Sequence, residues 1–515
     1  MRLLRALVLV LAGWALVSFG WAASRRVVYP YDLEWMEGGM LCHALQVDEG
    51  RPLYGPPSMR FVSFAYTPLY PIAVAELGKL FGLGYALARS VSVLAFGAAL
   101  VLGYAFVRTQ GGGPIVALAT LAVPAAAFAP TGAWYDLARV DSLSLALTTA
   151  GSLLGWWKRR SHAGVALAGA LLVAAFLTKQ TAAPFIVALA LGLFVAEPRR
   201  LPAYLAGLGI PAALSLWWLD RSSGGWFWTY AFGLHQRHPF NPVLAMLSTP
   251  ARLVLLIGPG LALVPWALRQ VRCAGLAYAS GLAAAGLAAA CLGAGTEWSY
   301  HNALIPGLFF GALAVGVAAG TLLSHYRRLK RPEPAVVLML LASSIASAPG
   351  GLVALLARVL PERARPQLEL PLGYDLRPFV PSTADRTSGD ALIARLRATP
   401  GEVFVPYHSF YAHLAGKDTY LHAMNLADLQ GAGFAPPRDL VEAIRGRRFA
   451  LVVLDLEYED LQEREPTAAA SREEDTLGLF PRLAGNYRLA ERISGPRTFS
   501  GGAFRPCCLA VPRPP

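Results

Sequence analysis

The chain has 515 residues, of which 55% are hydrophobic and only 15% are charged, whereas soluble domains carry about 25% charged residues. Its mean hydropathy of +0.45 and its repeated apolar runs exclude an ordinary soluble protein and predict a polytopic α-helical membrane protein. The net charge of +13 does not indicate a nucleic-acid partner, because the basic residues flank the apolar runs.

The first apolar run follows Arg2 and Arg5 and extends to about residue 22. A positive start before an apolar run is also typical of a signal peptide. However, the run approaches the length of about 20 residues that a span needs, and "FGWAASRR" is a poor cleavage context. We therefore expect an uncleaved first transmembrane helix.

Three carboxylates follow this run in "YPYDLEWMEGGM", at Asp32, Glu34 and Glu37. If the stretch is helical, Glu34 and Glu37 share a face, and Asp32 suits the helix N-terminus. Asp32 would then be only an N-cap and Glu34 only a solvated charge, which is the structural alternative to a catalytic role. Two glycines follow Glu37 and allow close approach of another chain segment or a ligand.

Eleven apolar segments have about the length of a membrane span. They lie at residues 3–22, 87–107, 114–130, 138–157, 163–178, 181–196, 201–219, 251–268, 274–293, 303–323 and 335–357. With eleven spans, every basic cluster falls on the same side of the membrane as the N-terminus. The positive-inside rule predicts that this side is cytoplasmic. The apolar segment 66–82 contains Pro68, Pro71, Glu76 and Lys79, so we interpret it as an interfacial helix.

These assignments predict a long outer loop at residues 23–85 that carries the acidic cluster. A second polar group, "WYDLARVDSLSLAL", contains Asp136, Arg139 and Asp141 where the fourth span begins. Ionisable residues that enter a membrane segment are candidates for function. The alternative is mutual neutralisation of Asp136 by Arg139 at a spacing of three residues.

Two further outer segments offer polar side chains. Lys179 stands alone between two apolar runs, where its ammonium could meet a phosphate or simply snorkel towards water. The segment "GTEWSYHN" offers Glu297, Tyr300, His301 and Asn302 as hydrogen-bonding groups for sugar hydroxyls. The aromatic loop at 220–250 is also compatible with an interfacial belt, and its two closely spaced histidines lack an evident third metal ligand.

The chain changes character after about residue 360, where apolar density falls and charge rises. "EVFVPYHSF" and "RFALVVLDLEY" are typical of strands, and "SGDALIARLRATP" and "PPRDLVEAIRGRR" of helices. We therefore expect a transmembrane domain at 1–360, a linker at 361–390 and a small extracytoplasmic α/β domain at 391–515. The adjacent Cys507 and Cys508 are expected to be free thiols.

The order of these features resembles the GT-C superfamily of membrane glycosyltransferases. The resemblance covers about residues 1–360 and rests on the acidic first loop, "YTPLYP", "GLGYALARSVSVLAFGAAL", the pair Arg139 and Asp141, and "LTKQTA". The nearest groups are the bacterial relatives of protein O-mannosyltransferases and of the lipid A aminoarabinose transferase.

The resemblance implies inverting transfer of a sugar from a polyprenyl-phosphate donor to a glycan, lipid or protein hydroxyl on the outer face of the bacterial inner membrane. An acid of the first loop would serve as general base, so the candidates are Glu37, Glu34 and Asp32. Lys179, Arg139, Asp141, Asp136, Tyr300, His301 and Asn302 are the candidate substrate-binding residues. The family pattern has an adjacent Asp-Glu pair, whereas this chain reads "DLEWMEGG", so the choice among the three acids stays open.

We expect no cofactor, because Walker A, GxGxxG, HExxH and GxSxG sequences are absent, and we predict no metal site although three acids could supply ligands. Two other functions stay open. A flippase for lipid-linked sugars would also need many spans and buried charges, and would be favoured by internal repeats. A non-catalytic assembly or sensor protein would explain the C-terminal domain, and would be favoured if Glu37, Arg139 and Lys179 lay far apart.

Overall fold

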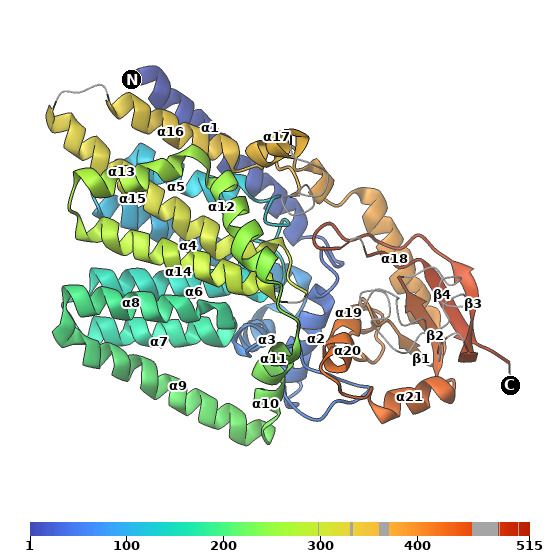
Figure 1. The fold of residues 1–515 in the computed structure, drawn as a ribbon. Coiled ribbons are helices and arrows are strands. Elements are labelled where there is room, and N and C mark those ends of the chain that lie inside the picture. Colours follow the sequence, from blue (N-terminus) through green and yellow to red (C-terminus); the bar gives the residue numbers. More distant parts are fainter. Residues whose placement is uncertain are drawn as a thin grey trace.

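The computed structural model describes residues 1–296, 298–329, 333–359, 370–455, 483, 485–502 and 504–514. A large bundle of helices forms one part of the molecule, and a small domain with a sheet forms the other (Figure 1). The chain thus has the predicted architecture of a polytopic helical protein with a small C-terminal α/β domain. The segment 361–369 of the predicted linker and Glu297 lie outside the described residues.

Each apolar segment predicted to span the membrane corresponds to a helix or to a pair of consecutive helices. The bundle helices are α1 (Arg2–Val27), α4 (Tyr85–Thr109), α5 (Pro114–Ala126), α6 (Val140–Trp157), α7 (His162–Thr178), α8 (Ala183–Ala196), α9 (Leu201–Ser223), α12 (Thr249–Ile257), α13 (Leu263–Gln270), α14 (Ala274–Gly295), α15 (Ile305–Leu329), α16 (Glu333–Ser347) and α17 (Gly351–Val359). Helices suit this setting because they satisfy their backbone polar groups internally, which a lipid environment requires.

The number of long spans is smaller than the eleven expected. Within the described part of the chain, six helices are long and apolar enough to cross a membrane, and three further apolar helices are shorter. The segment 335–357 is not one straight span, because α16 and α17 are bent by 74° at a break. Gly350 lies in this break with a φ of +94°, which an L-residue with a side chain rarely adopts.

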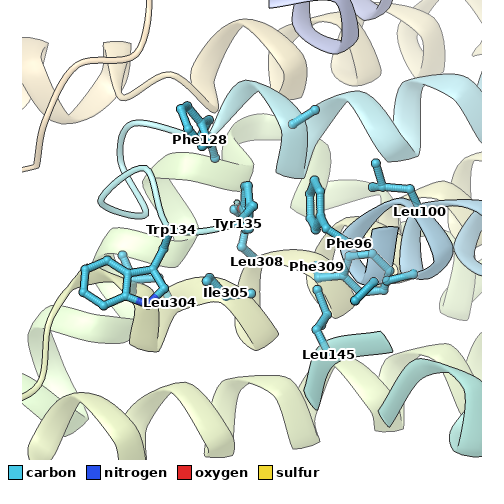
Figure 2. Close-up of a cluster of buried hydrophobic side chains, with 14 of the residues drawn as sticks. Phe96, Leu100, Phe128, Trp134, Tyr135, Leu145, Leu304, Ile305, Leu308 and Phe309 are labelled. Carbon is cyan, nitrogen blue, oxygen red and sulfur yellow. The ribbon is translucent and has the colours of Figure 1, made fainter. Parts of the chain in front are cut away.

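The helices pack through small and aromatic side chains. Small residues are common on their buried faces and let neighbouring backbones approach closely, as at Gly169, where an added Cβ would lie 2.8 Å from the backbone of α9. Aromatic rings fill the wider spaces near the ends of α4 and α5 (Figure 2). Phe96 stacks on Tyr135 with ring centroids 4.0 Å apart and interplanar angle of 7°. The aromatic core therefore packs against the loop at 131–139 and holds it in place.

The ends of the helices that carry basic residues meet at the side of the bundle away from the C-terminal domain (Figure 1). Arg160, after α6, pairs with Glu197, after α8, at 3.0 Å. Trp157 donates a hydrogen bond of 3.0 Å from Nε1 to Thr109 at the end of α4. The opposite ends of α4, α6 and α8 face the first loop and the C-terminal domain.

The first loop contains two short helices, α2 (Glu37–Asp48) and α3 (Leu69–Phe81). Helix α3 has 13 residues, which is too short to span a membrane, and its interfacial position stays a prediction. It ends at Gly82, whose φ of +82° allows the chain to turn sharply into α4. The aromatic loop at 220–250 is also largely helical, with α10 (Trp226–Trp228) and α11 (Leu234–Arg237).

The C-terminal domain is a four-stranded sheet covered by short helices. Its strands are β1 (Glu402–Phe404), β2 (Phe449–Leu454), β3 (Tyr487–Arg492) and β4 (Cys508–Pro512), and its helices are α18 (Thr383–Ala398), α19 (Phe410–Leu414), α20 (Ala423–Gly431) and α21 (Arg438–Arg445). The sheet order is β1-β2-β4-β3, with β1 and β2 parallel and the other pairs antiparallel. Helix α18 begins inside the segment expected to be a linker. The Sγ atoms of Cys507 and Cys508 lie 3.4 Å apart, so these two cysteines are not joined by a disulfide.

The predicted strand at 402–410 is shorter than expected. It ends at Phe404, and the chain then forms a loop that carries His408 before α19 begins. Because the strand ends early, this loop reaches the first loop of the bundle, where His408 contacts Asp32. The segment before β4 also reaches the first loop, where the backbone N–H groups of Phe499 and Ser500 donate to the Leu33 carbonyl at 2.7 and 2.9 Å. The two domains therefore meet at the acidic stretch.

Candidate functional site

The acidic stretch does not form one helix. Residues 29–36 are irregular, and α2 begins at Glu37 with Met36 as its N-cap. The prediction that Glu34 and Glu37 share a helical face is therefore wrong. Asp32 is not the N-cap, yet its Oδ1 accepts a hydrogen bond of 2.8 Å from the Gly38 N–H in the first turn, which is otherwise unpaired in a helix.

Glu37 is part of a buried ion pair. Its carboxylate receives Nε and Nη2 of Arg89, from α4, at 2.9 and 2.6 Å, and both side chains are fully buried. The backbone N–H groups of Leu33 and Ala138 each donate to it at 2.7 Å. These bonds outweigh the effect of burial, so the pKa of Glu37 is lowered. With its acceptor sites occupied, Glu37 ties the first loop to α4 and to the loop before α6.

The glycines after Glu37 allow close approach, as predicted, but to protein rather than to a ligand. A Cβ on Gly39 would lie 2.5 Å from Cζ of Phe64, and one on Gly38 would lie 3.2 Å from Oδ1 of Asp32. The first loop is therefore packed tightly against itself at this point.

Asp32 belongs to a buried chain of three charged groups between the domains. Its Oδ2 lies 2.7 Å from Nδ1 of His408, and Nε2 of His408 lies 2.8 Å from Oδ2 of Asp455. Burial opposes the charge on the imidazole, but the two carboxylates outweigh it and raise the pKa of His408 to about 10. His408 is therefore an imidazolium that holds the C-terminal domain on the first loop.

Asp136 likewise makes a structural pair. It accepts hydrogen bonds of 2.7 and 3.1 Å from Nε and Nη2 of Arg26, at the end of α1, and both side chains are fully buried. The expected alternative, in which Arg139 neutralises Asp136, is therefore wrong. Nη1 of Arg26 also donates to the Phe379 carbonyl at 2.6 Å, so this pair also binds the chain that leads into the C-terminal domain.

Glu34 differs from the other two acids of the stretch, because it lines a cavity. Its Oε2 accepts one hydrogen bond of 2.9 Å from Nη1 of Arg139, and Nη2 of Arg139 donates to the hydroxyl of Tyr66 at 2.7 Å. The backbone N–H of Met36 also stabilises the Glu34 carboxylate. Glu34 nevertheless has fewer partners than Glu37 and lines the cavity, where a bound molecule can reach it.

The pKa of Glu34 is raised to about 7. Burial is the main cause, because it disfavours the charged carboxylate, and the nearby Glu37 adds to it. Arg139 opposes both effects but does not cancel them. Near neutral pH the Glu34 carboxyl can therefore both accept and release a proton, which is what a general base or acid requires.

Asp141 sets the position of two candidate binding residues. Its Oδ1 accepts hydrogen bonds from Nζ of Lys179 at 2.6 Å and from the Asn302 amide at 3.0 Å. Its Oδ2 accepts a hydrogen bond of 2.9 Å from Nε1 of Trp134. Asp141 lies in the first turn of α6, and Lys179 directly follows the last turn of α7. The ends of these two helices therefore fix the position of the Asp141–Lys179 pair.

The cavity has a volume of about 940 Å³ and lies between the bundle and the C-terminal domain. Of the residues expected to bind substrate, Arg139, Lys179, Tyr300 and Asn302 line it together with Glu34. Gly132 has a φ of +80°, and a Cβ there would lie 2.6 Å from the Tyr300 ring, so this glycine allows Tyr300 to lie against Trp134. The structure therefore brings a carboxyl, a guanidinium and an ammonium to one cavity.

The remaining candidates do not reach this cavity. Asp32, Glu37 and Asp136 hold segments together, Asp141 lies behind Lys179, and His301 is not among the lining residues. The loop at 220–250 contributes Phe232, His235 and His238, whereas Phe227 and Tyr230 are fully buried in packing. Within the described ranges, no group of three or more His, Cys, Asp or Glu side chains is placed to hold a metal ion.

Sequence reasoning missed several residues that position the site, among them Arg26, Arg89, Tyr66, His408 and Asp455. Arg89 had a signal, because a lone arginine inside an apolar span is costly unless it is paired. Arg26 also had a signal, because it follows the first span on the predicted outer side, where basic residues are less frequent. His408 lies 376 residues after Asp32, and its second partner, Asp455, lies 47 residues further on. Both belong to a domain whose packing no local pattern reveals.

No protein-family model matches the chain, and no curated protein matches it by sequence. Comparison with solved structures does find similar folds. The crystal structures of ArnT from Cupriavidus metallidurans, one bound to undecaprenyl phosphate and one in the apo state, each have a TM-score of 0.55. Each alignment covers 98% of this chain and 97% of that chain, at 14% identity.

The chain is similar in fold to these ArnT structures. At 14% identity this similarity shows the fold alone, and it agrees with the resemblance to GT-C membrane glycosyltransferases, which rested on the bundle. The match also extends past residue 360, so the ArnT fold accounts for the C-terminal domain as well as the bundle.

Proposed function

We propose that the chain is a glycosyltransferase that moves a sugar from a polyprenyl-phosphate donor to an acceptor hydroxyl. The observation that carries the proposal is the convergence of Glu34, Arg139 and Lys179 on one cavity of about 940 Å³. The fold supports it, because one of the ArnT structures with this fold is bound to undecaprenyl phosphate. A pocket of this size would accept a sugar and the headgroup of its carrier.

The two cations would bind and stabilise the phosphate of the donor. Lys179 carries a compact charge with three donors, and Arg139 presents a planar guanidinium whose Nε makes no hydrogen bond in the described structure. As the bond between the anomeric carbon and the phosphate oxygen breaks, its electrons remain on that oxygen. Fixed cations in a partly dry cavity stabilise this developing charge more than water would.

Glu34 would be the general base. The acceptor hydroxyl loses its proton to the carboxylate while its oxygen forms the new bond to the anomeric carbon, on the side opposite the departing phosphate. This single displacement inverts the configuration. Glu37 and Asp32 are less suited, because Arg89 and His408 and the backbone groups around them occupy their oxygens.

The proposed reaction places the cavity at the outer face of the bacterial inner membrane. The N-terminus and the basic helix ends would then be cytoplasmic, and the C-terminal domain would be extracytoplasmic. The acceptor would enter from the side of the C-terminal domain and the carrier from the bilayer.

Binding of undecaprenyl phosphate to the purified chain in lipid nanodiscs tests the phosphate site. We expect Lys179→Met to raise the Kd at least about tenfold, because it removes a charge from the cavity and a partner of Asp141. Lys158→Met is the matched control, because Lys158 is exposed at the far end of α6. Equal affinities for the wild type and Lys179→Met would contradict the proposal.

Transfer of labelled sugar from polyprenyl-phosphate donors then tests the reaction itself. Loss of transfer in Glu34→Gln with retained carrier binding would support the base. If the carrier crossed the bilayer at the wild-type rate in all variants without any transfer, the protein would instead be a flippase.

A further inference from the structure

One part of the cavity lining, as far as the structure describes it, contains no cation, in contrast to the part with Arg139 and Lys179. It is formed by the loop at 220–250 and by α20 of the C-terminal domain, through His238 and Asp428. Nε2 of His238 lies 3.5 Å from Oδ1 of Asp428, and their side chains are only 3% and 6% exposed. Neither ring nitrogen of His238 makes a hydrogen bond in the part of the chain that the structure describes.

Burying an imidazole without hydrogen bonds destabilises the folded protein, and a bound molecule that supplies the missing partner removes part of this free-energy cost. Burial lowers the pKa of His238 to about 4, so the ring is uncharged near neutral pH. One ring nitrogen then donates and the other accepts. A sugar hydroxyl can do both, which makes it a suitable partner.

Two aromatic rings also line the cavity. Trp35, from the first loop, stacks on Phe504 with centroids 4.2 Å apart and an interplanar angle of 12°, and both line the cavity. Trp35 also lies 5.0 Å from the ring of His422, which caps α20. Helix α20 then presents Asp428 to the cavity, so the rings and the polar pair are contributed by connected elements. Apolar ring faces of this kind pack against the C–H face of a sugar.

We propose that this wall, formed by His238, Asp428, Trp35 and Phe504, binds a sugar ring of the acceptor that carries no phosphate. An aspartate beside an uncharged imidazole offers no cation to a phosphate, and its carboxylate would repel one. The inference rests on the proposed function, because it assigns the donor phosphate to Arg139 and Lys179 and the acceptor to this wall. It narrows the acceptor to glycans and glycolipids with an unphosphorylated sugar at the point of contact.

The test compares matched sugars on the full chain in nanodiscs. The probes are the methyl glycosides of glucose, galactose, mannose and N-acetylglucosamine, each beside its 6-phosphate, measured by calorimetry with and without saturating undecaprenyl phosphate. The carrier is added to occupy Arg139 and Lys179, so that a sugar phosphate cannot bind there instead. We expect at least one neutral glycoside to bind at least about tenfold more tightly than its 6-phosphate.

Two variants test whether His238 and Asp428 bind the glycoside. His238→Ala should weaken binding of that glycoside about tenfold, and Asp428→Asn should reduce the discrimination against the 6-phosphate. His162→Ala, an exposed histidine at the far end of α7, should change neither. Retained binding of undecaprenyl phosphate would show that a variant is folded.

The inference is overturned if no neutral glycoside binds, if a 6-phosphate binds as tightly as its neutral partner, or if His238→Ala keeps the wild-type affinity. These results would leave the proposed function standing. Failure of the wild type to bind undecaprenyl phosphate would instead contradict the proposed function, and the glycoside comparison without carrier would still test the wall.

Discussion

Removing the charge of Glu34 and removing the charge of Glu37 should impair different properties of the protein, although the two acids are only three residues apart. Glu34→Gln and Glu37→Gln each keep the shape of the side chain and remove its charge. Glu34 lines the cavity and receives one hydrogen bond from Arg139, whereas Glu37 receives two from Arg89 and is fully buried with it. We expect the first change to impair catalysis and the second to impair folding.

The magnitudes follow from these contacts. In Glu34→Gln the amide oxygen can still accept from Arg139, and the nearby Asp141 remains as an anion beside this buried guanidinium, so the cost in stability is roughly 1–2 kcal/mol. Loss of a general base lowers the rate about 10²- to 10⁴-fold, which corresponds to about 3–5 kcal/mol in the barrier. Glu37→Gln leaves the Arg89 guanidinium buried without its counter-ion, at a cost of about 3–5 kcal/mol in stability.

The assay measures the transfer rate per carrier-binding site, together with the thermal unfolding midpoint of each variant in nanodiscs. We expect Glu34→Gln to unfold close to the wild type and to lose transfer, and Glu37→Gln to unfold at a clearly lower temperature. The reasoning is refuted if Glu34→Gln retains transfer within about threefold of the wild type. It is also refuted if Glu37→Gln is as stable as the wild type yet inactive.

Three further predictions follow from the site and the domain contact. Because burial raises the pKa of Glu34 to about 7, the kcat/KM for transfer should rise with pH around that value, and a profile that stays flat between about pH 5 and 9 would argue against Glu34 as base. Gly501 has a φ of +71°, and a Cβ added there would lie 3.1 Å from Cγ of Glu34. Gly50 is the matched control, because it has a similar φ of +68° but no atom within 4 Å of an added Cβ. Gly501→Ala and Gly50→Ala should therefore each cost about 1–2 kcal/mol in stability, but only Gly501→Ala should lower kcat, and equal kcat values would be evidence against this contact. The imidazolium of His408 has a pKa of about 10 in the folded protein and about 6.5 when unfolded, so its stabilisation is complete below about pH 6.5 and is lost as the pH rises towards 10. The difference in Tm between the wild type and His408→Gln should thus be larger at pH 6 than at pH 10, and the opposite trend would contradict the ion-pair assignment.

The bundle was predictable because its signals are local. A run of apolar residues bounded by Pro, Gly or charge forms a helix wherever it lies, since a helix satisfies its own backbone. Each predicted span accordingly corresponds to one helix or to two consecutive helices. The number of long spans and the bend between α16 and α17 were not predictable, because tilt and bending depend on packing against neighbouring helices.

The site was predictable only as a set of candidates. The sequence identified three acids in the stretch "DLEWMEGG" of the first loop, and it predicted that Lys179 and Arg139 lie at a similar depth. The sequence did not distinguish the roles of the three acids, because it does not show which groups surround each carboxylate in the folded protein. The partners come from α4 for Glu37 and from the C-terminal domain for Asp32.

The sequence by itself determined that the chain is a helical membrane protein with an acidic first loop and a separate C-terminal domain, since hydropathy and charge depend on neighbours along the chain. Only the tertiary structure decided that Glu34, rather than Glu37 or Asp32, meets Arg139 and Lys179 in a cavity. The physical reason is that burial and pairing set whether a carboxyl is a structural anion or a group free to exchange a proton, and both depend on segments that are far apart in the sequence.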